Sequence, residues 1–158
     1  MSVAAVPSRS INWKAALVVT VVLGAAAVLA GPNGPLGSFW RPAADSSHPT
    51  GAQLPLFLLL NIAEGLTFGF GIAFLVFGYP VVRAISPASA GLTRAAHVSI
   101  GWLLSNWWPH DSLHIHNGMN MGGLLGIEYG FHITLMIAGV ILARFFLTLL
   151  RRQPAASR

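Results

Sequence analysis

The chain has 158 residues, of which 54% are hydrophobic and 8% charged, and its mean hydropathy is +0.67. A soluble domain carries about 25% charged residues, so this composition excludes a surface that meets water on all sides and favours one domain, residues 1–158, embedded in a lipid bilayer. The net charge is +5, but the basic residues lie singly between apolar runs, which argues against nucleic-acid binding. The absence of cysteine excludes disulfides, thiolate metal sites, iron–sulfur clusters and thioether-attached haem.

Four apolar segments are long enough, or nearly long enough, to cross a bilayer core, which needs about 20 apolar residues in a helix. In chain order they are residues 13–30, 54–82, 95–108 and 124–150. Within the second segment, Gly65 and Gly69 form a pair of small residues that lets two helix backbones approach closely. We therefore expect an all-α fold, an integral membrane four-helix bundle.

Charge placement orients these segments. Basic residues precede the first segment, flank the connection between the second and third, and follow or end the fourth: Arg9, Lys14, Arg83, Arg94, Arg144, Arg151, Arg152 and Arg158. The other two connections carry Arg41 alone. By the positive-inside rule, both termini are cytoplasmic and the connections 31–53 and 109–123 face outward from a plasma (inner) membrane.

The first thirty residues also fit a second interpretation. They have a basic start, an apolar stretch and the letters VLA before Gly31, which is typical of a cleaved signal peptide. Cleavage would remove one helix and leave the orientation of the other three unchanged.

Two acidic residues lie inside the predicted spans, where a charged group costs about 2.5–3.5 kcal/mol at mid-helix and usually marks function. Glu64 lies in the second span, and Asn61 precedes it on the same helix face. Glu128 and His132 are four residues apart in the fourth span, so they also share a face. We expect these ionisable groups at similar depth in the outer half of the bilayer. The alternative is a Glu–His pair that only fixes helix register.

The third span is short, since fourteen residues from Ala95 to Trp108 cover about 21 Å as a helix. Either the helix continues past Pro109, or the bilayer thins, or the next segment dips back between the helices as a loop. We favour a dipping, histidine-rich loop, because backbone buried by protein tolerates membrane depth. His97, near the other end of this span, is expected only to bond a carbonyl.

The segment HDSLHIHNGMNM, residues 110–121, concentrates metal-binding side chains. If Asp111 caps a short helix that ends at Gly118, His110 and His114 lie on one side of it. If the segment is extended, His114 and His116 point the same way. The predicted metal ligands are His110, Asp111, His114, His116, Glu128 and His132, supported by Asn61, Glu64, Met119 and Met121.

Imidazole suits zinc, copper, iron and nickel, while thioether sulfur selects copper(I). The mixture of histidine, methionine and carboxylate makes copper the first prediction, with zinc and iron open. Histidines that only bond carbonyls and cap helix ends are the alternative.

These observations predict a small membrane protein with an outward-facing metal site, acting in metal handling or as an accessory subunit of a membrane metalloenzyme. One alternative is a haem-binding electron-transfer subunit, although His97 and His132 lie at different depths for such a pair. Others are a metal-dependent enzyme with Glu64 or Glu128 as general base, a structural or assembly subunit without metal, and a transporter. The expected partners are the lipid bilayer and other membrane subunits or further copies of the chain.

Overall fold

The structure, a computed structural model, describes residues 12–86 and 88–151, and this part of the chain is helical and contains no strand. It has seven α-helices: α1 (Trp13–Ala30), α2 (Leu54–Phe77), α3 (Tyr79–Ile85), α4 (Ala90–Ser105), α5 (Trp107–Asn117), α6 (Met121–Glu128) and α7 (Thr134–Leu150). A short 3₁₀ helix, η1 (Gly37–Trp40), follows α1, and a π-helical turn, η2 (Tyr129–Ile133), joins α6 to α7. The all-α prediction is confirmed.

Within residues 12–86 and 88–151, three helices are long and apolar enough to cross a membrane: Trp13–Ala30, Leu54–Phe77 and the continuous helical segment Met121–Leu150. The first has the bounds expected from the sequence, because the Asn12 side chain caps its start by accepting a hydrogen bond from the Ala15 N–H at 3.1 Å. Asn120 caps α6 in the same way, accepting from the Gly123 N–H at 3.0 Å.

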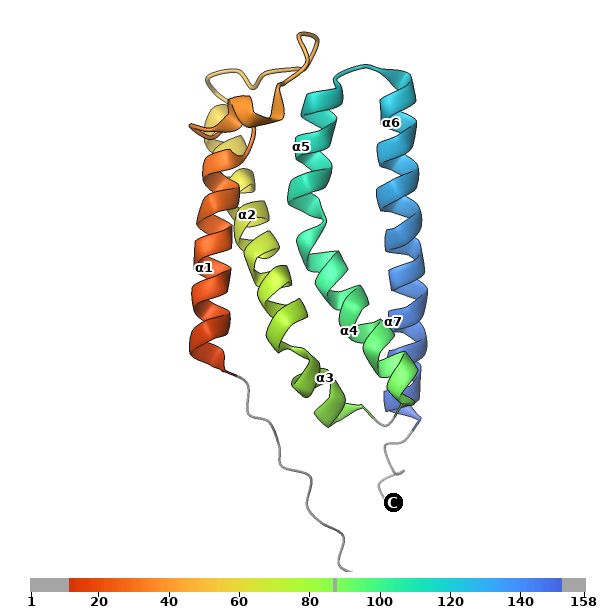
Figure 1. The fold of residues 1–158 in the computed structure, drawn as a ribbon. Helices are drawn as coiled ribbons and strands as arrows, with labels where there is room; N and C mark the ends of the chain where they lie inside the picture. Colours follow the sequence, from red (N-terminus) through yellow and green to blue (C-terminus); the bar gives the residue numbers. More distant parts are fainter. Residues whose placement is uncertain (1–11, 87, 152–158) are drawn as a thin grey trace, which may run out of the picture.

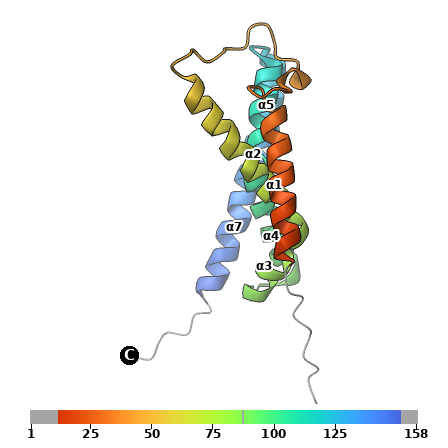
Figure 2. The ribbon, with the colours of Figure 1, turned by 90° about the vertical axis from the view of Figure 1, so that its left-hand side faces the viewer.

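The long helices stand side by side, with α1 packed on α2, α2 on α4 and α4 on α7 (Figure 1). Viewed from the side, α2 crosses α1 at an angle, so that the first part of α2 diverges from α1 (Figure 2). Glycines allow the close approach of α1 and α2: a Cβ atom at Gly69 would collide with the backbone of Thr20 and Gly24. The packing role expected for Gly65 and Gly69 is therefore confirmed.

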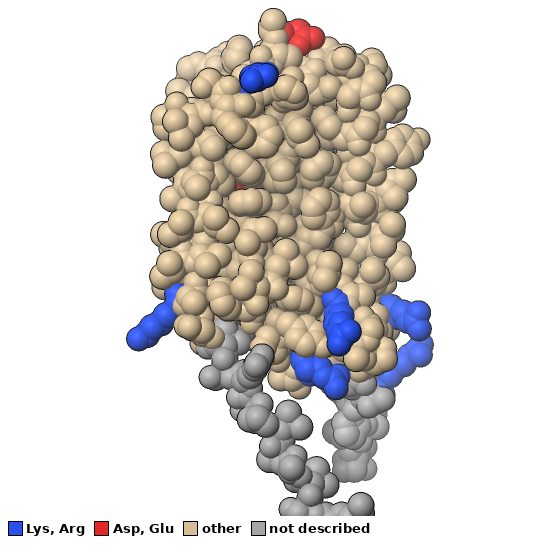
Figure 3. Space-filling view, in the orientation of Figure 1, with Lys and Arg blue, Asp and Glu red and all other residues tan. Residues whose placement is uncertain are grey.

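The two ends of the molecule differ in charge (Figure 3). One end is formed by the start of α1, by α3, by the start of α4 and by the end of α7, and we call it the basic end; its described basic residues are Lys14, Arg83, Arg94, Arg144 and Arg151. The other end, where α5 ends and α6 begins, is called the histidine end.

The second predicted span is interrupted. Residues 54–82 were expected to form one helix, but α2 ends at Phe77 and α3 begins at Tyr79. Pro80 has no N–H to continue the ladder, and it occupies the first turn of α3, where none is needed. The Gly78 N–H closes α2 by donating to the Phe74 carbonyl at 2.7 Å.

The prediction of a dipping, histidine-rich loop after the third span is wrong. The chain bends at Asn106 and continues as α5, so residues 107–117 are helical. Pro109 lies in the first turn of α5, where its missing N–H costs nothing. Asn106 is fully buried at the bend, and its Nδ2 donates to the carbonyls of Trp102 and Leu103 at 2.8 and 3.0 Å. Asn106, and not Asp111, precedes the helix, which ends before Gly118 as one alternative predicted.

Candidate metal centre

Two histidines on one face of α5 form the first half of the site. His110 and His114 are four residues apart in a helix, so their side chains lie one above the other. Their Nε2 atoms are 3.2 Å apart. The ring of His110 is largely buried, with 12% of its side-chain surface exposed. The helix that replaces the expected loop therefore produces the two-histidine arrangement by its own periodicity.

Glu128 supplies the other half from the last residue of α6. Its Oε1 lies 3.6 Å from the His114 Nε2, and one ligand atom from each of His110, His114 and Glu128 lies within 4.8 Å of the others. Bonds of about 2.0–2.1 Å to a tetrahedral ion place its ligand atoms about 3.3–3.4 Å apart. The distance between the two Nε2 atoms is slightly shorter than this value and the distance from Nε2 to Oε1 slightly longer, so the three side chains could hold a metal ion.

The second ring nitrogen of His110 is also occupied. His110 Nδ1 lies 3.0 Å from the Asp111 Oδ1, and the Glu64 carboxyl on α2 is a neighbour of the Asp111 carboxyl. A histidine that binds a metal through one nitrogen commonly donates the other N–H to a carboxylate, which fixes the ring and its tautomer. Asp111 can do this for His110, and Glu64 extends the line of contacts to a third helix.

His132 contacts the second carboxylate oxygen of Glu128, Oε2. Its Nδ1 lies 2.5 Å from the Glu128 Oε2, which leaves Oε1 directed to the His114 side. The contact confirms that Glu128 and His132 share a face, as their spacing predicted. The ring centres of His132 and His110 are 5.4 Å apart, so the three histidine rings and Glu128 form one cluster.

One side of this cluster is open. The side chains of Glu128 and His132 are 43% and 49% exposed, whereas His110 is enclosed by the rings of Phe131 and Trp107. A bound ion would thus have three protein ligands and a side that the described part of the chain does not cover, where a further ligand could bind.

Other predicted site residues lie elsewhere. His116 is on another side of α5, where its Nδ1 donates to the Trp40 carbonyl at 2.6 Å and ties α5 to η1. Met119 and Met121 are exposed. Asn61 is buried between α1 and α2, and its Nδ2 donates to the Val28 carbonyl at 3.2 Å.

His97 is buried far along α4 from the bend at Asn106, and its Nε2 donates to the Phe74 carbonyl at 3.0 Å. This confirms that it bonds a carbonyl.

Two residues with a part in the site were not anticipated. Phe131 packs against His110 with ring centres 5.1 Å apart, and Asn106 sets the bend that directs α5 toward α6. An asparagine shortly before a proline is typical of a helix start, although the Asn106 side chain donates back to α4 and does not cap α5. Phe131 had no signal in the sequence, because an aromatic residue in an apolar span looks the same whether it faces lipid or a site.

Comparisons of the chain with protein-family models, with curated proteins and with solved structures give no match. A function for the chain therefore has to be inferred from its own geometry.

Proposed function

We propose that the chain is an integral membrane protein that holds a divalent transition-metal ion between α5 and α6 through His110, His114 and Glu128. The observation that carries this proposal is the spacing of the three ligand atoms, with 3.2 Å between the two Nε2 atoms and 3.6 Å from one of them to Oε1. The Asp111 contact to the other nitrogen of His110 supports it, since that partner orients a metal-binding ring.

We further propose a four-helix bundle with α1, α2, the α4–α5 unit and the α6–α7 unit as its spans. The bend at Asn106 supports counting α4 and α5 as one span, because Ala90–Ser105 alone is short for a bilayer core. Basic residues collect at the end of the molecule that also holds the start of α1 and the end of α7 (Figure 3). By the positive-inside rule this end is cytoplasmic and the metal centre faces outward from a plasma (inner) membrane.

The ligand set favours zinc or copper(II). Two imidazoles and a carboxylate, with an open position, are the ligands of many zinc sites, and the same set accepts copper(II) and iron(II). The sequence argument for copper depended on thioether sulfur; Met119 and Met121 are exposed, and Met119 lines a hollow together with His114. Because the three ligand atoms that lie together are two imidazole nitrogens and one carboxylate oxygen, we place zinc first and copper(II) second.

A role in metal handling, or as an accessory subunit of a membrane metalloenzyme, fits the exposure of the site. Glu128 and His132 lie in an apolar helical segment, and lipid contact with such groups is costly. A second copy of the chain or another membrane subunit over this face would remove that cost and could exchange the ion through the open position.

A structural or assembly subunit is the second candidate, because the same distances also suit plain hydrogen bonds. His114 can donate from Nε2 to His110, Glu128 can pair with His132, and the contact between His114 and Glu128 would then join α5 to α6 without any ion. The haem alternative has less support, since the nitrogen of His97 that bonds Phe74 is already engaged.

Elemental analysis of the detergent-purified chain tests the proposal. We expect about one zinc or copper ion per chain, lost in the His114→Ala, Glu128→Ala variant and kept in His116→Ala, which removes a histidine of the same helix outside the group. If the unaltered chain binds neither added zinc nor added copper with a defined stoichiometry, the metal proposal is wrong and the structural or assembly role is favoured. A Soret band in its absorption spectrum would restore the haem alternative.

A further inference from the structure

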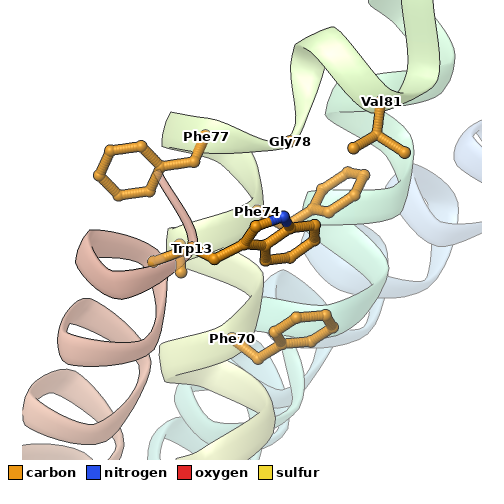
Figure 4. A pocket seen from close by; sticks show the side chains of 8 residues that line it. Trp13, Phe70, Phe74, Phe77, Gly78 and Val81 are labelled. Carbon is orange, nitrogen blue, oxygen red and sulfur yellow. The ribbon is translucent and has the colours of Figure 1, made fainter. Parts of the chain in front are cut away.

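A cavity of about 140 Å³ lies at the basic end, far from the metal centre, between α1, α2 and α3. Its walls are apolar and largely aromatic: Trp13, Ala16, Phe70, Phe74, Phe77 and Val81. Figure 4 shows the Trp13 indole reaching from α1 toward α2, among Phe70, Phe74 and Val81. An apolar cavity of about 150 Å³ stays dry and takes up apolar molecules, so a space of this size and lining suits hydrocarbon.

The break between α2 and α3 lies at the cavity. Phe77, at the end of α2, and Gly78 line it, and so does Val81 in the first turn of α3. Phe74, which lines the cavity, is held in place by His97 of α4. The centres of the two rings are 5.2 Å apart, and the His97 Nε2 donates to the Phe74 carbonyl. The cavity is therefore a built feature of this end of the fold.

Two cationic residues are close in sequence to residues that line the cavity. Lys14 follows Trp13, and Arg83 lies two residues beyond Val81; both are exposed at the basic end, and neither forms an ion pair within residues 12–86 and 88–151. The four acidic residues of the chain are Asp45, which precedes α2, and the site carboxyls Glu64, Asp111 and Glu128. None of these four acidic side chains thus lies at the basic end.

We propose that the cavity takes up part of one acyl chain of an anionic phospholipid whose headgroup is attracted to the basic end, where Lys14 and Arg83 lie. The aromatic walls supply the contact with hydrocarbon, and the unpaired cations supply the preference for a negatively charged headgroup. Attraction of a basic residue to an anionic membrane surface is worth about 1 kcal/mol, which is about a fivefold preference for each cation. The site is independent of the metal centre.

Native mass spectrometry of the full chain, released from detergent with added phosphatidylglycerol or phosphatidylcholine, measures this preference. We expect tighter retention of phosphatidylglycerol, reduced about fivefold in Lys14→Gln or Arg83→Gln. Arg41→Gln, which removes a basic residue outside the basic end, is the matched control and is expected to change nothing. Equal retention of the two lipids by the unaltered chain overturns the proposal.

A second variant tests the cavity itself. Ala16→Phe fills the space from α1, and Ala26→Phe places the same ring on an exposed position of the same helix outside the cavity. We expect only Ala16→Phe to lose phosphatidylglycerol. Equal retention by both folded variants also overturns the proposal.

If Ala16→Phe does not fold, a measurement on the unaltered chain tests whether phosphatidylglycerol binds next to Trp13. In phosphatidylcholine vesicles, a small fraction of phosphatidylglycerol with brominated acyl chains is expected to quench tryptophan fluorescence more than the same fraction of brominated phosphatidylcholine. Trp13→Phe is expected to remove that excess. Equal quenching by the two brominated lipids contradicts the proposal.

Discussion

The α1–α2 pair and the α5–α6 pair are held together by different forces. Gly24, Gly65 and Gly69 bring the backbones of α1 and α2 into direct contact. Between α5 and α6, a Cβ at Gly123 would meet only the side chain of Asn117, and the ionisable side chains of His114 and Glu128 bridge the two helices. In lipid, helices associate through close packing and polar contacts; backbone packing dominates the first pair, beside one hydrogen bond from Asn61 to Val28, and ionisable groups dominate the second. The first pair should therefore respond to side-chain volume and the second to ions and protons.

The largest expected effect is on the glycine-packed pair. Gly69→Leu forces a side chain into the backbone of α1, and overpacking of this kind costs about 3 kcal/mol or more. Thermal unfolding in detergent, followed by circular dichroism, should show a large loss of stability. Gly139→Leu is the control, because a Cβ there meets open space and the stability should hardly change. Equal losses in both variants would show that close glycine packing does not hold the first pair together.

Metal should stabilise the second pair alone. An ion at one hundred times its dissociation constant stabilises the folded chain by about 2.7 kcal/mol. Hydrogen exchange should slow in α5 and α6 on addition of zinc and stay unchanged in α1 and α2. Protons compete with the ion for imidazole, so the protection should weaken as the pH falls. Slowing in α1 and α2 to the same degree would contradict a local site.

Asp111→Asn tests how the His110 ring is oriented. Loss of a carboxylate partner to a ligating histidine typically lowers metal affinity about 10- to 100-fold, so titration with zinc should show a drop in that range. Asp45→Asn is the matched control, since Asp45 accepts from the Met119 N–H outside the group. An unchanged affinity in Asp111→Asn would mean that the ring is held by packing alone.

The smallest expected effect concerns the start of α6. Asn120→Ala removes a helix cap worth about 1 kcal/mol, and Ser89→Ala removes the equivalent cap of α4. Chemical denaturation should show similar modest losses for the two. Bound zinc should offset the loss in Asn120→Ala to the same degree as in the unaltered chain, because the cap does not touch the ligands. A selective loss of zinc binding in Asn120→Ala would show that the α6 start shapes the site.

The sequence predicted the fold class and part of the site because both depend on short-range rules. Apolar length defined Trp13–Ala30, and a spacing of four residues placed Glu128 beside His132. The conformation of the chain after the third span could not be predicted from Pro109, because a proline can follow the end of a helix or lie in the first turn of one. In the structure the helix restarts, and the buried amide of Asn106 donates to the carbonyls of Trp102 and Leu103 at the bend.

The choice among the histidines depended on the same bend. In an extended loop, His114 pairs with His116, whereas in a helix it pairs with His110 and the intervening rotation carries His116 to the Trp40 carbonyl. Phe131, which encloses His110, comes from a contact between helices and could not be read from spacing within one of them.

The π-helical turn Tyr129–Ile133 divides the last helix into two rotational phases. Upstream of it, Glu128 points to α5; downstream, Ala138 and Phe145 are buried, and Phe145 lies in the apolar cluster with Ala96 of α4. Each residue of an α-helix turns the chain by about 100°, so deleting one residue from the turn would rotate α7 by that amount against α6. The π-helical turn thus sets the rotation of α7 relative to α6. As a result, one continuous helix directs Glu128 to the histidines of α5 and directs Phe145 to the apolar face of α4.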